Sequence, residues 1–122
     1  DGDLSAQWEV VEAFLAAARR GDFEGLVAVL DPDVVLRADG GDLAGLTRYI
    51  RGAETVATQA SMWSRVALDM RRALVNGTPG FVSTRDGQPF SVAAVTISGG
   101  RIVEIDILAD PERLAKLDLA VL

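Results

Sequence analysis

The chain has 122 residues, no cysteine and no histidine, and twelve basic against eighteen acidic residues, so its formal net charge is −6. The absence of cysteine and histidine excludes disulfides, cysteine or histidine metal sites, Cys-His dyads and Ser-His-Asp triads. The net negative charge gives a surface that on average repels a phosphate backbone. We therefore expect no direct contact with nucleic acid. The length fits one domain over residues 1–122, and no apolar run reaches the roughly 18 to 20 residues that span a bilayer. We expect a soluble, cytoplasmic protein with no membrane contact.

The first part of the chain has the spacing of helices. Apolar residues recur every three or four positions over residues 8–18, in a segment that Ser5 could cap. Asp22 can cap a second helix, whose apolar stripe extends over residues 23–30. The sequence Asp31-Pro32-Asp33 then ends the helical pattern.

A short strand is expected over residues 34–36, because three β-branched or aliphatic residues follow one another there. A loop follows and continues without a clear period through residues 43–51. The apolar spacing after Gly52 predicts a third helix on Val56, Ala60, Trp63 and Ala67.

From Asp69 onward, turn signals arrive about every ten residues, which is typical of consecutive antiparallel strands. The third run between them is apolar on both faces, so it is expected to be a central strand. The economical prediction is a four-stranded antiparallel meander over residues 69–75, 80–85, 89–98 and 101–108.

Apolar and acidic residues alternate in the last of these runs. Val103, Ile105 and Ile107 are expected on one face, and Glu104 and Asp106 on the other. Two carboxylates at this spacing could form an acid–base pair, but a face toward solvent or a partner is the favoured interpretation.

After the meander, Asp110 and Pro111 have the properties of a helix start, with Glu112 in the first turn. A short closing helix through Leu114 and Leu117 is expected. Helices first and a curled meander afterwards predict an α+β fold with helices packed on one face of the sheet.

This order of elements resembles the cone-shaped nuclear transport factor 2-like fold of SnoaL-like polyketide cyclases and ketosteroid isomerases, in which a curved antiparallel sheet wraps on N-terminal helices. The segments "FLAAARRGDFEGLVAVLDPDVVLRADGGD", "RGAETVA", "VNGTPGFV" and "GGRIVEIDILADPERLAKL" permit a narrower resemblance. Together they are similar to the SnoaL-like C-terminal extension of certain extracytoplasmic-function RNA polymerase sigma factors.

Two motifs mark that extension in the family. An Asp-Gly-Gly-Gly-Lys loop after the first strand is here Asp39-Gly40-Gly41, followed by Asp42 and Leu43. An Asn-Pro-Asp-Lys-Leu segment near the end is here Asp110-Pro111-Glu112-Arg113-Leu114. The lost lysine and the added Asp42 reverse the charge of the first loop, so a contact through that lysine does not carry over. The glycine turn does carry over, because glycine reaches conformations that cost other residues energy.

The resemblance implies a regulatory module that contacts the sigma regions of its own polypeptide and modulates their engagement with RNA polymerase. Because this chain contains no sigma region 2 or 4, we expect either a fragment of a longer sigma factor or a stand-alone relative. Neither a cofactor nor a metal is expected, and homodimers through the sheet are common in this fold by resemblance. The expected regulatory contacts are Asp39, Gly40, Gly41, Asp110, Pro111 and Leu114.

The rival hypothesis is a small-molecule isomerase, cyclase or hydrolase of the SnoaL or ketosteroid isomerase type, or a pocket that senses a small apolar ligand. Asp39 lies near the strand end where steroid isomerases, by resemblance, place their base, and a carboxylate buried in a pocket suits general-base work. Tyr49 could donate a hydrogen bond to an oxyanion, and Asp106 is a further candidate. The role of Asp39 as a base depends on which face of the strand its side chain occupies, because a slip of one residue turns Ala38 inward and leaves no base. Regulation is favoured over catalysis.

Overall fold

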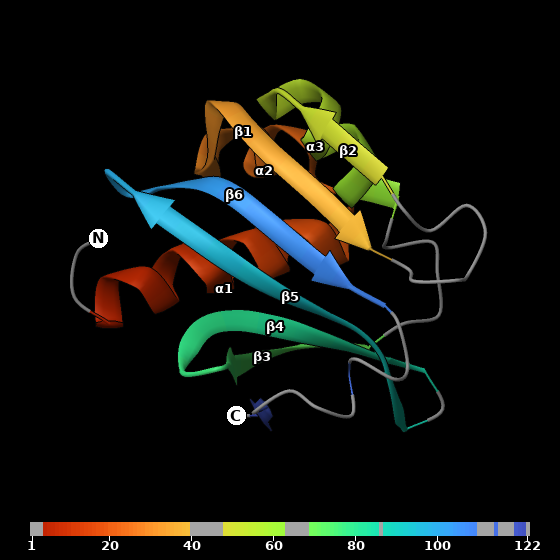
Figure 1. Cartoon of the computed structure of the whole chain (residues 1–122). Coiled ribbons are helices and arrows are strands. Elements are labelled where there is room, and N and C mark those ends of the chain that lie inside the picture. The colour runs from red at the N-terminus through yellow and green to blue at the C-terminus, as the bar shows by residue number, and fades with distance from the viewer. Residues whose placement is uncertain are drawn as a thin grey trace.

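The computed structural model of the chain describes residues 4–39, 48–62, 69–85, 87–109, 114 and 119–121 (Figure 1). The elements of this described part, in chain order, are α1 (Leu4–Arg20), α2 (Phe23–Val29), β1 (Leu30–Asp39), β2 (Arg48–Arg51), α3 (Ala53–Ser61), β3 (Asp69–Val75), β4 (Thr78–Arg85), β5 (Gln88–Ser98), β6 (Arg101–Leu108) and β7 (Leu119–Val121). None of the described helices is both long and apolar enough to cross a membrane.

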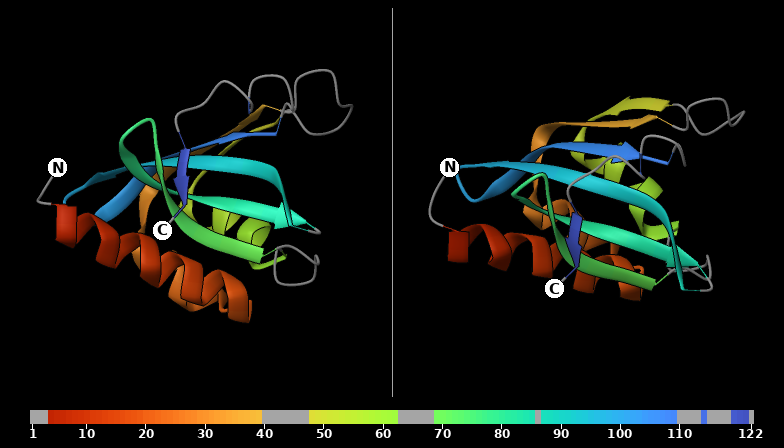
Figure 2. Two further views of the ribbon diagram at one scale, coloured as in Figure 1. Left: turned by 90° about the horizontal axis from the view of Figure 1, so that it is seen from below. Right: turned by 60° about the horizontal axis from the view of Figure 1, so that its bottom comes forward.

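The strands form one sheet in the order β2-β1-β6-β5-β4-β3-β7. Among the pairs described, β1 and β6 run parallel and all the others are antiparallel. The sheet is curved, and the helices lie on one side of it (Figure 2). We call that side the inner face and the opposite side the outer face. The predicted α+β class, with helices on one face of a mostly antiparallel sheet, is confirmed.

The first two helices follow from their apolar spacing and one cap. Helix α1 begins at Leu4, so Ser5 lies inside its first turn and is not the cap that we expected. Asp22 does cap α2, because its side chain accepts a hydrogen bond from the backbone N–H of Gly25 at 3.1 Å. The buried face of α1 consists of Val11, Phe14, Leu15, Ala17 and Ala18.

Strand β1 is longer than the predicted residues 34–36. It begins at Leu30, directly after α2, and continues to Asp39. Its pairing with β6 shifts register between Leu30 and Val35, and the exposed Pro32 lies in this irregular part. A proline is tolerated where a strand bulges, because no ladder hydrogen bond is required of it there.

Strand β2 lies in a region that was expected to be a loop, so that expectation is wrong for residues 48–51, whereas residues 43–47 lie outside the described residues. Its partner is β1, with Ile50 opposite Leu36 and Tyr49 opposite Arg37. Gly52, at φ +99°, then makes the turn into α3. The predicted third helix is confirmed through Ser61, whereas Trp63 and Ala67 lie outside the described residues.

The predicted meander is confirmed as β3 to β6, and β5 occupies the middle of the sheet as its two apolar faces indicated. Both residues of the Asn76-Gly77 and Gly99-Gly100 turns have positive φ, the conformation that two-residue hairpin loops require. One detail of β6 differs from the expected alternation. A bulge pairs Thr96 with Glu104 and Ile97 with Ile102, so Ile102 takes the inward position that was expected for Val103.

Apolar side chains form a main core on the inner face of the sheet and a smaller cluster on part of the outer face. The main core fills the inner face and includes Phe14 of α1, whose ring lies 5.7 Å from that of Phe81 on β4. A smaller cluster of Ala73, Val75, Val82 and Val92 lies on the outer face of β3 to β5, and Leu114 packs against it. Leu114 is helical, as expected, but the other residues of the predicted closing helix, including Leu117, lie outside the described residues. The short strand β7 beside β3 was not predicted.

Candidate functional site

The parity of β1 determines which residue faces the helices near the end of the strand. Ala38 packs against the main core, so the alternation places Asp39 on the outer face. This is the arrangement in which the inward position holds no base. The inward positions of β1, β5 and β6 that belong to or pack on the core hold no ionisable side chain: Val34, Leu36, Ala38, Ala93, Val95, Ile97, Ile102, Ile105 and Ile107.

The two segments that resemble the family's marked motifs begin side by side. Strands β1 and β6 run parallel and end with Asp39 opposite Leu108. The backbone N–H of Ala109 donates a hydrogen bond of 2.8 Å to the carbonyl of Asp39. The chain therefore leaves both strands at one corner of the sheet, which we call the Asp39–Ala109 corner. The predicted contact residues Gly40, Gly41, Asp110 and Pro111 lie outside the described residues.

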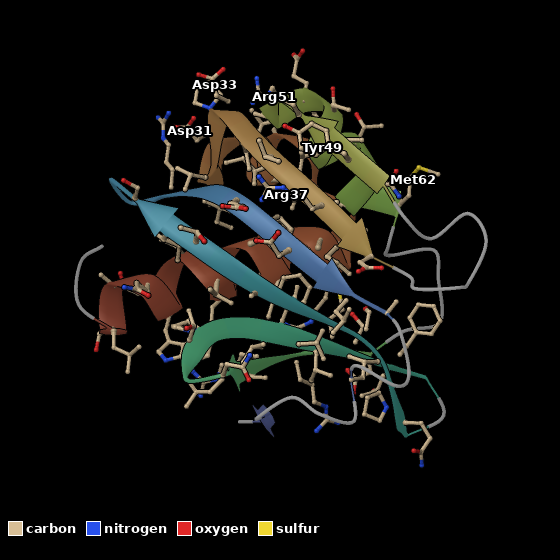
Figure 3. The ribbon with its side chains drawn as sticks, in the orientation of Figure 1. Asp31, Asp33, Arg37, Tyr49, Arg51 and Met62 are labelled. Carbon is tan, nitrogen blue, oxygen red and sulfur yellow. The ribbon has the colours of Figure 1, made fainter. Side chains whose placement is uncertain are left out.

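Next to this corner, the outer face carries an ionic cluster. Arg37 forms ion pairs with Glu104 and, at 3.4 Å, with Asp106. Its guanidinium also lies 5.9 Å from the ring centroid of Tyr49, within the range of cation–π attraction. We call these four residues the Arg37 cluster; Figure 3 views this face with Arg37 and Tyr49 labelled.

Strand register explains why these four side chains meet. Arg37 lies directly opposite Tyr49 on β2 and directly opposite Asp106 on β6, while Val35 lies opposite Glu104. All are therefore on one face of three neighbouring strands. The structure thus brings together two of the three predicted catalytic candidates, Tyr49 and Asp106, on the face where Asp39 also lies.

The Arg37 cluster is open to solvent. Tyr49 is 58% exposed, and the side chains of Glu104 and Asp106 are 31% and 45% exposed. The expectation that these two carboxylates face solvent or a partner agrees with their position. Within the described residues, no three acidic side chains come together in a way that could hold a metal ion.

A shallow hollow of about 430 Å³ lies elsewhere, between β2 and α3. Its lining contains one carboxylate, that of Glu54, and none of the predicted site residues. The lining residues are Ile50, Glu54, Thr55, Thr58 and Gln59.

Replacing Arg37 with glutamine should lower the free energy of unfolding by about 0.2 to 1 kcal/mol at low salt, the usual range for exposed ion pairs. The change leaves Glu104 and Asp106 without their shared cation. Urea denaturation in low and high salt measures the loss, which should shrink at high salt because ions screen exposed charges. The exposed Arg101→Gln on β6 is the control, and an Arg37→Gln effect that is no larger than that of Arg101→Gln would contradict the role of the cluster.

A curved, mostly antiparallel sheet with helices packed on its inner face defines the nuclear transport factor 2-like class of α+β proteins. Within that class the chain belongs to the SnoaL-like domain family, whose sequence profile matches residues 11–105. The resemblance drawn from the sequence is thereby confirmed.

The chain is also similar to two sigma factors, one compared by sequence and one by structure. The chain is 31% identical over 109 residues to the probable extracytoplasmic-function RNA polymerase sigma factor SigI of Mycobacterium tuberculosis, and the match covers 88% of this chain but only 36% of SigI. The crystal structure of the M. tuberculosis extracytoplasmic-function sigma factor SigJ matches with a TM-score of 0.67 and 26% identity, over 89% of this chain and 44% of SigJ.

An M. tuberculosis LEH-like epoxide hydrolase is also similar, with a TM-score of 0.58 and 22% identity over 92% of this chain and 88% of that one. At this identity the likeness shows the fold alone. The chain is therefore a SnoaL-like domain that is homologous to about a third of the length of SigI.

Proposed function

We propose that this domain regulates transcription initiation through contacts with the sigma regions of a longer polypeptide, and that it performs no reaction of its own. The observation that carries the proposal is the match to SigI, which extends over 88% of this chain at 31% identity. The contact segments are the one that begins with Asp39, Gly40 and Gly41 and the one over residues 110–114.

The geometry of the described residues supports contact more than chemistry. The two segments leave the sheet at the same Asp39–Ala109 corner, so a single partner surface can touch both. A reaction centre of the isomerase or hydrolase type needs a concave pocket with a titratable group directed into it. The carboxylates of Asp106 and Glu104 instead lie on an open face and share Arg37.

Transcription with purified components tests this proposal. The full reading frame is expected to encode sigma regions beside the domain, and run-off transcription then compares the full-length protein with a form that lacks the domain. We expect the initiation rate to change by at least about fivefold, a usual size for coupling between sites. Asp39→Ala and Pro111→Ala should each reproduce part of that change.

The exposed Glu24→Ala on α2 is the control, because it removes a carboxylate on the helical side. If the truncated protein and both variants initiate at the wild-type rate, or if the reading frame contains no sigma regions, the proposal is wrong.

A further inference from the structure

The outer face of the sheet has two halves with different surroundings. Over β3 to β5, Ala73, Val82 and Val92 are at most 2% exposed, and Leu114 of the chain itself packs on them. Over β2, β1 and β6, the Arg37 cluster defined above is exposed among the described residues. We call this second region the open half.

The four residues of the Arg37 cluster carry one more negative than positive charge between them, and Arg51 adds a second guanidinium beside Tyr49. Arg37 contributes one positive charge, whereas Glu104 and Asp106 contribute two negative charges. A carboxylate has about four acceptor positions, and the single guanidinium of Arg37 cannot occupy all of those on two carboxylates. The pair can therefore accept hydrogen bonds from a further cationic side chain without losing Arg37.

The same half offers an apolar anchor. Tyr49 is 58% exposed, and its ring is held by Arg37 on one side while its hydroxyl lies 3.5 Å from the guanidinium of Arg51. Tyrosine and arginine are enriched among the residues that dominate protein interfaces, because they bury much area and keep a polar end.

We infer that the open half binds a basic surface of a sigma region in the same polypeptide, with Glu104 and Asp106 accepting from lysine or arginine and Tyr49 packed at the centre. This inference rests on the proposed function and names the surface that performs it. Modules that bind promoter DNA carry clustered lysine and arginine, which complements both this carboxylate pair and the net charge of −6.

Two observations support a partner surface in the same polypeptide. Because the chain spans only 36% of SigI, nearly two-thirds of such a polypeptide remains to supply the partner surface. The open half is also continuous with the Asp39–Ala109 corner, since Arg37 and Asp106 lie two residues before Asp39 and Leu108 on the same two strands. A contact at that corner therefore extends directly onto the carboxylate pair.

The test uses the full-length protein with a protease site inserted ahead of the domain. After cleavage, the dissociation constant of the two parts is measured by analytical ultracentrifugation at low salt. The double variant Glu104→Gln with Asp106→Asn should dissociate about tenfold more readily, as expected when close interfacial charge pairs are lost.

The matched control is Glu9→Gln with Glu24→Gln, which removes the same charge from exposed positions on α1 and α2. This control should stay within about twofold of wild type, because distant exposed charges are largely screened. Urea denaturation verifies that both double variants are folded.

The outcomes separate the inference from the proposed function. If wild type stays associated and both double variants behave alike, the open half is not the contact surface, although the sigma contact stands. If the wild-type parts do not associate, the proposed function itself fails. A selective loss in the Glu104→Gln, Asp106→Asn protein supports both.

Discussion

Replacing Phe14 with alanine should lower the free energy of unfolding by about 3 to 5 kcal/mol, the usual cost of removing a buried phenylalanine. Phe14 is fully buried at the centre of the α1 face, and its ring lies 5.7 Å from that of Phe81 on β4. The substitution removes this contact and leaves a cavity between the helix and the sheet, which the rigid strands fill only in part. Equilibrium denaturation in urea, followed by circular dichroism, measures the loss.

The control for Phe14 is Leu4→Ala at the start of the same helix. Leu4 is 54% exposed, so this change should alter stability by no more than about 0.5 kcal/mol. A Phe14→Ala loss below about 1 kcal/mol would mean that α1 does not pack on the inner face as described.

Replacing Gly80 with alanine should also be strongly destabilising, by about 3 kcal/mol, at the upper end of the usual range for overpacking. A Cβ atom at Gly80 would lie 2.1 Å from the carbonyl oxygen of Ala93 on the neighbouring strand β5. The carbonyl oxygen is a backbone atom and the Cβ atom is bonded directly to the backbone, so neither can rotate away. The two strands must therefore separate. The measured quantity is again the midpoint and slope of urea unfolding.

The sign of this result is diagnostic. An alanine that replaces a glycine with free space normally stabilises a protein by about 0.4 to 1 kcal/mol, because the unfolded chain loses freedom. Thr78→Ala, at an exposed position of β4, is the control and should be nearly neutral. A neutral or stabilising Gly80→Ala would show that β4 and β5 are not paired in the described register.

The parts of the fold that were predictable depend on signals within a few residues. The bounds of β3 and β6 agree with the predicted residues 69–75 and 101–108, because the Asn76-Gly77 and Gly99-Gly100 turns flank them. The cap at Asp22 is equally local.

The parts that were not predictable depend on a distant partner strand. The short run Arg48–Arg51 has no turn signal of its own and becomes a strand because β1 is available beside it. Val103 is displaced by a bulge whose position is set by its pairing with β5, and β1 extends back to Leu30 because β6 continues alongside it.

The candidate site, too, was predictable where neighbouring residues determine it and not where a distant strand does. Alternation along β6 was sufficient to place Glu104 and Asp106 on the face opposite Ile105. The role of Arg37 was missed, because Asp106 is 69 residues away along the chain and only the parallel pairing of β1 with β6 joins them. The orientation of Asp39 was ambiguous by one residue until the packing of Ala38 against the core resolved it.

The most direct test of regulation by contact is the dissociation constant between the wild-type domain and the rest of the full-length polypeptide after cleavage between them. Inter-domain surfaces resemble transient interfaces, so we expect the parts to remain associated with a dissociation constant of about 1 to 10 µM. Complete separation at concentrations of about 100 µM would contradict a regulatory contact with the sigma regions.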